Sequence, residues 1–172
     1  MWKQNAIDAC VFGTKTHLIM ENYIIGKERN DEYNNLYDSF NEIVENDFKC
    51  AKAILSEHLL YSDEYKIAGT ADLIIEHNDS EFSVGDFKTN KKIDFCNNWG
   101  ERMLNPISHL SDCNYNLYSL QLSLYAYLFS LKTGKKCRKN FLMHLKDNKW
   151  NYIPCNYMEY EIRMMLKFYI KK

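Results

Sequence analysis

The sequence predicts an α/β domain in which helices flank a mixed central β-sheet. Near both ends of the chain, apolar residues recur at spacings of three and four, which is the period of an amphipathic helix. Between these segments, two short stretches alternate apolar and polar residues on either side of a cluster of turn-forming residues. The resulting order of helices, strands, helix, strands and helix is typical of an α/β fold.

Two helices are expected in the first third of the chain. The first runs from Thr14 to Ile25, directly behind Gly13. The second runs from about Asn34 to Leu55, because the apolar side chains between these positions keep the helical spacing. The following segment, Ser56 to Tyr61, fits either a short strand or a helix end.

A β-hairpin is expected in the middle of the chain. Its strands are Lys66 to His77 and Phe82 to Thr89, and the polar residues between them form the turn. A five-residue turn centred on Asp79 would place Asp72 directly across from Asp86. Side chains in such positions have Cβ atoms about 4.5–5.5 Å apart.

The second half of the chain begins with its least regular segment, Asn90 to Asn116, and loops of this length often carry function. The elements expected after it are a helix from Tyr118 to Leu131 capped by Gly134, a strand pair at Lys139 to Leu145 and Trp150 to Pro154, and a closing helix from about Met158 to Ile170.

Composition narrows the class of protein. A length of 172 residues fits one domain, so residues 1–172 are expected to form a single unit. Apolar residues at 46% and charged residues at 26% exclude disordered, collagen-like and coiled-coil chains. We find neither a signal peptide nor a run of about 20 apolar residues, so we expect a cytoplasmic protein without a membrane partner. The formal net charge of −1 gives no overall field, so a polyanion would be held by a local patch.

The six cysteines are scattered singly, without a CxxC pair. The spacing of a structural zinc site is therefore absent. Reduced and mostly buried thiols are the expected state.

The hairpin carries the most informative charged residues. Two carboxylates as close as Asp72 and Asp86 repel each other unless a cation lies between them. Lys88 follows Asp86 by two positions and shares its face of the strand. Oxygen ligands of this kind suit Mg²⁺ or Mn²⁺. The alternative is a solvated surface, with Lys88 paired to Asp86.

The segments Gly69-Thr70-Ala71-Asp72 and Asp86-Phe87-Lys88-Thr89 resemble the G-x-x-D…D-x-K-T core of PD-(D/E)XK nucleases. Three further signals resemble the RecB-like branch of that superfamily, and all occur in the family's order. They are Gly13 to His17 as a G-x-x-x-H motif, Gln121 to Tyr125 as a Q-x-x-x-Y motif, and Glu57 as a further acidic position before the hairpin.

The resemblance implies a restriction-endonuclease-like core and a phosphodiesterase that uses one or two Mg²⁺ or Mn²⁺ ions. Its implied metal ligands are Asp72, Asp86 and the Phe87 carbonyl, with His17 as an imidazole ligand and Glu57 holding a second ion or a water. Lys88 would position or activate the attacking water. Gln121 and Tyr125 lie four residues apart, hence on one helical face, and would donate hydrogen bonds near the metal centre.

The resemblance also implies the biological setting. We expect a deoxyribonuclease, an exonuclease acting on single-stranded DNA or duplex ends, in DNA processing, recombination or repair in a bacterium or a phage-infected cell. An oligomer or a recombination or replication partner stays open. Some RecB-like nucleases hold an iron–sulfur cluster with one early and three clustered late cysteines. Here only Cys137 and Cys155 are late, and they are far apart, so we expect no cluster. The alternative function is a silent module of the same fold that binds nucleic acid or a partner protein.

Overall fold

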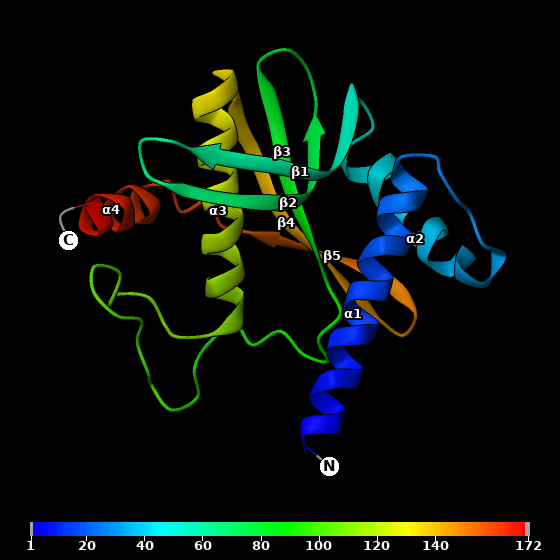
Figure 1. The fold of residues 1–172 in the computed structure, drawn as a ribbon, viewed down its shortest axis with the longest axis horizontal. Coiled ribbons are helices and arrows are strands. Elements are labelled where there is room, and N and C mark those ends of the chain that lie inside the picture. Colours follow the sequence, from blue (N-terminus) through cyan, green and yellow to red (C-terminus); the bar gives the residue numbers. More distant parts are fainter. Residues whose placement is uncertain (1, 171–172) are drawn as a thin grey trace.

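The computed structural model describes residues 2–170 and arranges them as a five-stranded sheet with helices packed around it (Figure 1). The predicted α/β class with a mixed sheet is confirmed. In chain order the elements are α1 (Trp2–Ile24), the 3₁₀ turn η1 (Asp31–Tyr33), α2 (Asn34–Asp47), β1 (Ala53–Ser62), β2 (Ile67–Glu76), β3 (Glu81–Lys88), α3 (Asn114–Thr133), β4 (Lys136–Lys146), β5 (Lys149–Cys155) and α4 (Glu159–Ile170).

The strands lie in chain order, β1-β2-β3-β4-β5. Neighbouring strands are antiparallel except β3 and β4, which run parallel. A parallel pair needs a long crossover connection, and α3 supplies it. In Figure 1, α3 crosses the sheet, with α4 on one side of it and α1 and α2 on the other.

Helices cover both faces of the sheet, as the alternation along β4 shows. Phe141 and Met143 lie in the cluster formed with α1 and α2, whereas Leu142 between them lies in the cluster formed with α3. A third cluster packs α4 and the loop 89–113 against α3, through residues such as Ile107 and Ile162. The helix α3 therefore packs between the sheet and an outer layer.

The second predicted helix is too long. The helix α2 ends at Asp47, and Ala53–Ser62 forms β1, so the expected helix to Leu55 is wrong beyond Asp47 and the strand alternative for the next segment is correct. Apolar spacing continues across the boundary, but Phe48 leaves helical geometry with φ −134° and is buried. The Lys52 N–H then bonds to the Glu76 carbonyl of β2. Pairing with β2 overrides the local periodicity.

The first predicted helix is too short, because α1 already includes Trp2 and passes through Gly13. Glycine inside a helix costs up to about 1 kcal/mol relative to alanine. Here a Cβ atom at Gly13 would lie 3.2 Å from the Thr89 hydroxyl oxygen, just beyond β3. The missing side chain lets α1 approach the end of β3.

The hairpin and α3 agree with the sequence. Ile74 pairs with Val84, which confirms the predicted register of β2 and β3. The helix α3 begins earlier than expected but ends at Gly134, whose φ of 72° and N–H bond to the Ser130 carbonyl form the predicted cap. Of the described helices, none is both long and apolar enough to cross a membrane.

Gly85 offers a test of this packing. A Cβ atom there would lie 2.4 Å from Cζ of Phe141, a fully buried side chain on β4. We expect Gly85→Ala to lower the free energy of unfolding by about 2 kcal/mol, because the core has to shift to admit the methyl group. Urea unfolding measures this. Adding Phe141→Leu should recover part of the loss, and an unchanged stability of Gly85→Ala would contradict this packing.

Candidate active site

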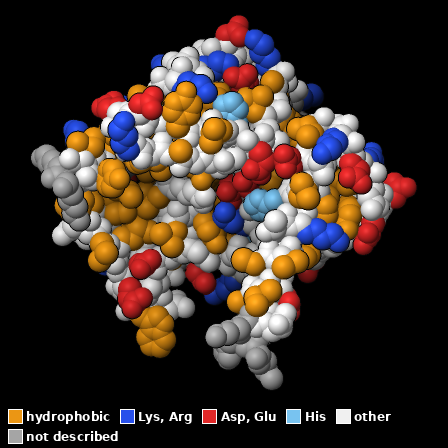
Figure 2. Space-filling model, in the orientation of Figure 1, with side chains coloured by type: hydrophobic (Ala, Val, Ile, Leu, Met, Phe, Trp, Pro, Cys, Tyr) orange, Lys and Arg blue, Asp and Glu red, His pale blue; other side chains and the backbone are white. Residues whose placement is uncertain are grey.

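Three neighbouring strands each carry an acidic residue at the same level of the sheet. The pairing of β2 with β3 ends at Leu73 and Gly85, and Asp72 and Asp86 are the residues directly beyond that last pair. The residues that flank Glu57 in β1 pair with those that flank Asp72 in β2, so these two acids also lie across from each other. Figure 2 shows acidic side chains gathered near the centre of one face, with histidine and a basic side chain beside them.

Asp72 is held by groups from two other elements. Its Oδ2 atom accepts a hydrogen bond of 2.9 Å from the backbone N–H of Phe87 in β3. The same oxygen lies 3.2 Å from Nδ1 of His17, which α1 brings to the sheet. Asp72 is only 9% exposed, so both contacts fix a buried carboxyl group. The histidine of α1 thus reaches the predicted acidic pair.

Asp86 is paired with Lys88, two residues further along β3. The Lys88 ammonium contacts Oδ2 of Asp86, which is 2% exposed. The same ammonium lies 4.6 Å from the ring centroid of Tyr118 on α3, a cation–π contact. Lys88 is therefore fixed between a carboxylate and an aromatic face. The pairing that the solvated alternative assumed does occur, but Asp86 is buried.

Glu57 has an unusual backbone for a strand residue. Its φ is 49°, in the left-handed region, while its neighbours remain paired with β2. Such a conformation costs a non-glycine residue about 1–2 kcal/mol, and functional sites commonly hold strain of this kind. The side chain is exposed and approaches His17 and Asp72.

These side chains fit a divalent cation. One donor atom from each of His17, Glu57 and Asp72 lies within 4.8 Å of the others. Two carboxylates are suitable ligands for Mg²⁺ or Mn²⁺, and the imidazole favours Mn²⁺ of the two. Asp86 lies next to these three ligands. The contact that Phe87 makes with Asp72 is through its backbone N–H.

The pKa shifts of the carboxyl groups also favour a bound cation. Burial, followed by the charge of Asp86, raises the pKa of Asp72 to about 8. Burial also raises the pKa of Asp86, although the Lys88 charge opposes it. Burial and then the charges of Glu21 and Asp86 raise the pKa of Glu57. The cluster disfavours its own negative charge, and a bound cation would relieve this.

The pKa of His17 is shifted in the direction that favours metal binding by its imidazole. Burial lowers its pKa, and the Lys88 charge adds to this, while Asp86 and a hydrogen bond to the Phe87 backbone oppose it. A lowered pKa keeps the imidazole neutral, which is the form that binds metals. Glu21, four residues along α1, acts on this site through its charge on Glu57.

Gln121 and Tyr125 lie on the face of α3 that also carries Tyr118. The Gln121 amide donates a hydrogen bond of 3.1 Å to the Tyr125 hydroxyl. A Cβ atom at Gly69 would lie 2.8 Å from Cε1 of Tyr125, so the first glycine of the β2 motif makes room for this ring. With Tyr118 these residues follow spacings of three and four, and so share one face of α3. Tyr118 touches Lys88, so this face begins at the acidic cluster.

Sequence reasoning missed two of these contacts. From the sequence, Tyr118 is only one of several apolar residues in a predicted helix. Its position three residues before Gln121 is the signal that would have placed it on the same face. The approach of Gly13 to Thr89 depends on two segments far apart in the chain. No local sequence pattern predicts such a contact.

The strained backbone of Glu57 gives a second stability test. We expect Glu57→Gly to be about 1 kcal/mol more stable than Glu57→Ala, because only glycine adopts positive φ without strain. Thermal or urea unfolding of both variants measures the difference. The same pair at Leu59, an exposed position of β1, should show the opposite order. Equal stabilities of the Glu57 variants would argue against strain at this residue.

No protein-family model and no curated protein matches this chain. Among solved structures, it is similar to a protein of Eubacterium rectale named "Putative exonuclease", at 12% identity and a TM-score of 0.52, over 95% of this chain and 65% of that one. It is also similar to SSO0001, at 18% identity and a TM-score of 0.46, over 98% of this chain and 62% of that one. The chain thus spans less than two thirds of either structure. The first likeness shows a nuclease-like fold.

Proposed function

We propose that this chain is a metal-dependent DNA nuclease, an exonuclease of the RecB-like branch of the PD-(D/E)XK superfamily that acts in phage or bacterial DNA processing. One observation carries the proposal: the carboxylates of Asp72 and Asp86, the Lys88 ammonium and the His17 imidazole converge where the pairing of β2 with β3 ends. The fold shared with a protein named as an exonuclease supports it.

In this proposal Asp72 and Asp86 hold one or two Mg²⁺ or Mn²⁺ ions, with the Phe87 carbonyl, His17 and Glu57 as further ligands. The bound ion would supply Lewis-acid stabilisation of the phosphate charge and a more acidic water. Burial raises the pKa of both aspartates, so ion binding also offsets a charge that the fold itself disfavours. The geometric set of His17, Glu57 and Asp72 supports the ligand assignment.

Lys88 would orient the water or stabilise the charge of the phosphate. Its side chain is largely buried and its ammonium is held by Asp86 and the Tyr118 ring, so it enters the reaction already positioned. Gln121 and Tyr125 would donate hydrogen bonds to the DNA backbone from the adjoining face of α3. Their mutual hydrogen bond keeps both donors in one orientation.

We propose that the enzyme holds no iron–sulfur cluster. The clusters of this branch need one early and three clustered late cysteines, and here only Cys137 and Cys155 are late. Cys137 is the second residue of β4 and Cys155 is the last residue of β5, so neither belongs to a cysteine-rich segment.

The test is a cleavage assay with DNA labelled at the 5′ or the 3′ end, in single-stranded and duplex form. We expect shortening of the labelled strands with Mn²⁺ or Mg²⁺ and none with EDTA. Single-nucleotide products from one end would support an exonuclease, and internal fragments an endonuclease. A protein that binds these DNAs but cuts none of them with either ion would instead be the silent binding module.

A further inference from the structure

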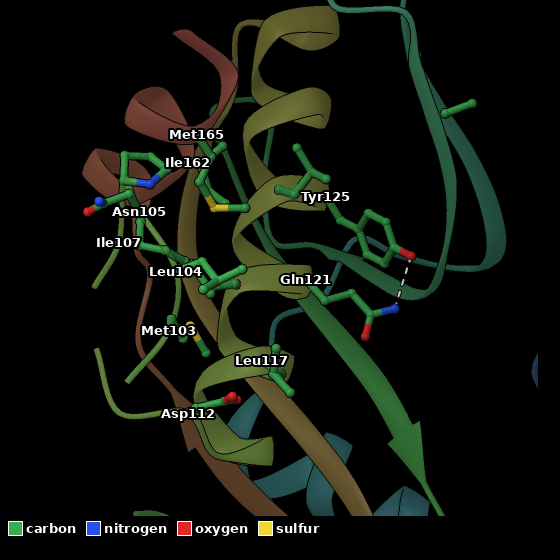
Figure 3. A pocket seen from close by; sticks show the side chains of 14 residues that line it. Met103, Leu104, Asn105, Ile107, Asp112, Leu117, Gln121, Tyr125, Ile162 and Met165 are labelled. Carbon is green, nitrogen blue, oxygen red and sulfur yellow. Dashed lines mark hydrogen bonds between the residues drawn. The ribbon is translucent and has the colours of Figure 1, made fainter. Parts of the chain in front are cut away.

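A groove of about 600 Å³ runs over α3, outside the acidic cluster. The loop 89–113, α3 and α4 form most of its wall, and Ala68 of β2 contributes to it. In Figure 3, Gln121 and Tyr125 lie on one side of α3, while the labelled side chains of the loop and α4 lie on the other. The groove is thus apolar along the loop and α4 and polar at the end formed by Gln121 and Tyr125.

The polar end of the groove leads to the proposed active site. Gln121 and Tyr125 line the groove and share a face of α3 with Tyr118, which contacts Lys88. Along β2, Ala68 precedes Asp72 by four residues, which is roughly 13 Å in an extended strand. A short stretch of a single strand can span that distance. A nucleotide near the cleaved phosphate can therefore reach the groove.

The chemistry of the groove excludes phosphate and favours an apolar solute. Among the described residues that line it there is no lysine or arginine. Leu104 is 86% exposed and Leu117 is 51% exposed, so apolar side chains face the open groove. Two amides, Gln121 and Asn105, supply both donors and acceptors. Apolar walls with a few polar groups that set orientation are typical of small-ligand sites of this volume.

We propose that the groove binds an unpaired nucleobase of the strand whose phosphate enters the acidic cluster, an inference that rests on the nuclease function proposed above. A nucleobase has apolar faces for the leucine and methionine side chains and polar edges for the amides. A base within a duplex is stacked and paired, so it reaches the groove only after leaving the helix. The preferred substrate is therefore single-stranded DNA or a frayed end.

Abasic DNA allows the contribution of the base to binding to be measured separately from that of the backbone. We would compare a short single-stranded oligonucleotide with the same strand carrying abasic sites, which keeps every phosphate. Fluorescence anisotropy in EDTA measures binding without cleavage. We expect abasic DNA to bind about tenfold more weakly. With Mn²⁺, a single abasic site moved along the strand should slow cleavage most at one fixed distance from the cut.

Variants test the groove itself. Leu117→Glu and Leu104→Glu alter exposed side chains, so we expect them to fold and to bind single-stranded DNA about tenfold more weakly, with no further loss on abasic DNA. The control is Leu131→Glu, which adds the same charge to α3 at a position 54% exposed and outside the groove. Leu117→Ala repeats the test without a new charge.

The outcomes separate this inference from the proposed function. Cleavage that treats normal and abasic strands alike, with unchanged Leu117 and Leu104 variants, would overturn the groove while leaving the nuclease. A protein that never cuts, yet loses affinity for abasic strands through these variants, would keep the groove and overturn the nuclease. If Leu117→Glu instead converts a dimer to a monomer, or releases a bound protein, and leaves DNA affinity unchanged, the groove is a protein interface and the inference fails.

Discussion

Replacing Asp86 or Lys88 by alanine is expected to reduce DNA cleavage by about a thousandfold or more, because each substitution removes a group that the proposed mechanism places at the reacting phosphate. The effect should appear in the rate constant for cleavage under saturating DNA and Mn²⁺. Single-turnover measurements read it directly. DNA binding in EDTA should change much less, since Asp86 is 2% exposed and contributes little surface to a ligand.

Folding has to be controlled in these variants, because Lys88→Ala leaves Asp86 buried without its partner. Lys88→Met keeps the length of the side chain, and the double variant Asp86→Asn with Lys88→Met removes both charges together. Lys146→Ala, an exposed lysine at the end of β4, is the matched control. Substantial cleavage by folded Lys88→Met would refute the role assigned to the lysine.

Saturating Mn²⁺ is expected to raise the melting temperature of the metal-free protein by about 5 °C or more. An ion at 100 times its dissociation constant stabilises the native state by about 2.7 kcal/mol. In a domain of this size each kcal/mol corresponds to about 2–4 °C. Differential scanning fluorimetry with increasing Mn²⁺ or Mg²⁺, against EDTA, measures the shift without any DNA present.

The variant Asp72→Asn should abolish most of that shift. Its amide oxygen can still accept the hydrogen bond from Phe87, so the local structure survives while the ligand charge is lost. We also expect its metal-free form to melt no lower than the native chain, because the raised pKa of Asp72 marks a carboxylate that the fold disfavours. Asp79→Asn, on the exposed β2–β3 turn, is the control. A full Mn²⁺ shift in Asp72→Asn would remove Asp72 from the ligand set.

The predicted elements were most accurate where a boundary had a local cause. The β2–β3 register follows from a short polar turn, and the end of α3 follows from a glycine that adopts positive φ at Gly134. The prediction failed at Phe48 to Leu55, where apolar spacing suits both a helix and a strand. Only the partner strand β2 decides between these states. The sequence predicts a helix boundary at Gly13, although Gly13 is an interior residue of α1 that packs against Thr89.

In the candidate site, too, contacts between near neighbours in the sequence were predictable, and contacts between distant segments were not. The proximity of Asp72, Asp86 and Lys88 was predictable, because all three belong to one hairpin. The resemblance implies that His17 is a metal ligand, and its contact with Asp72 depends on how α1 docks on the sheet. The positive φ of Glu57 has no signal in the sequence.

By itself, the sequence determined the alternation, turn and caps that build the hairpin and α3, and with them the acidic pair and its lysine. These features depend on neighbours within a few residues, whose conformations are limited by local sterics and hydrogen bonding. The tertiary structure alone decided that β1 adds Glu57, that α1 adds His17, and that the loop, α3 and α4 enclose an apolar groove beside Gln121 and Tyr125. Those arrangements depend on burying apolar surface between distant segments, a quantity that belongs to the folded chain as a whole.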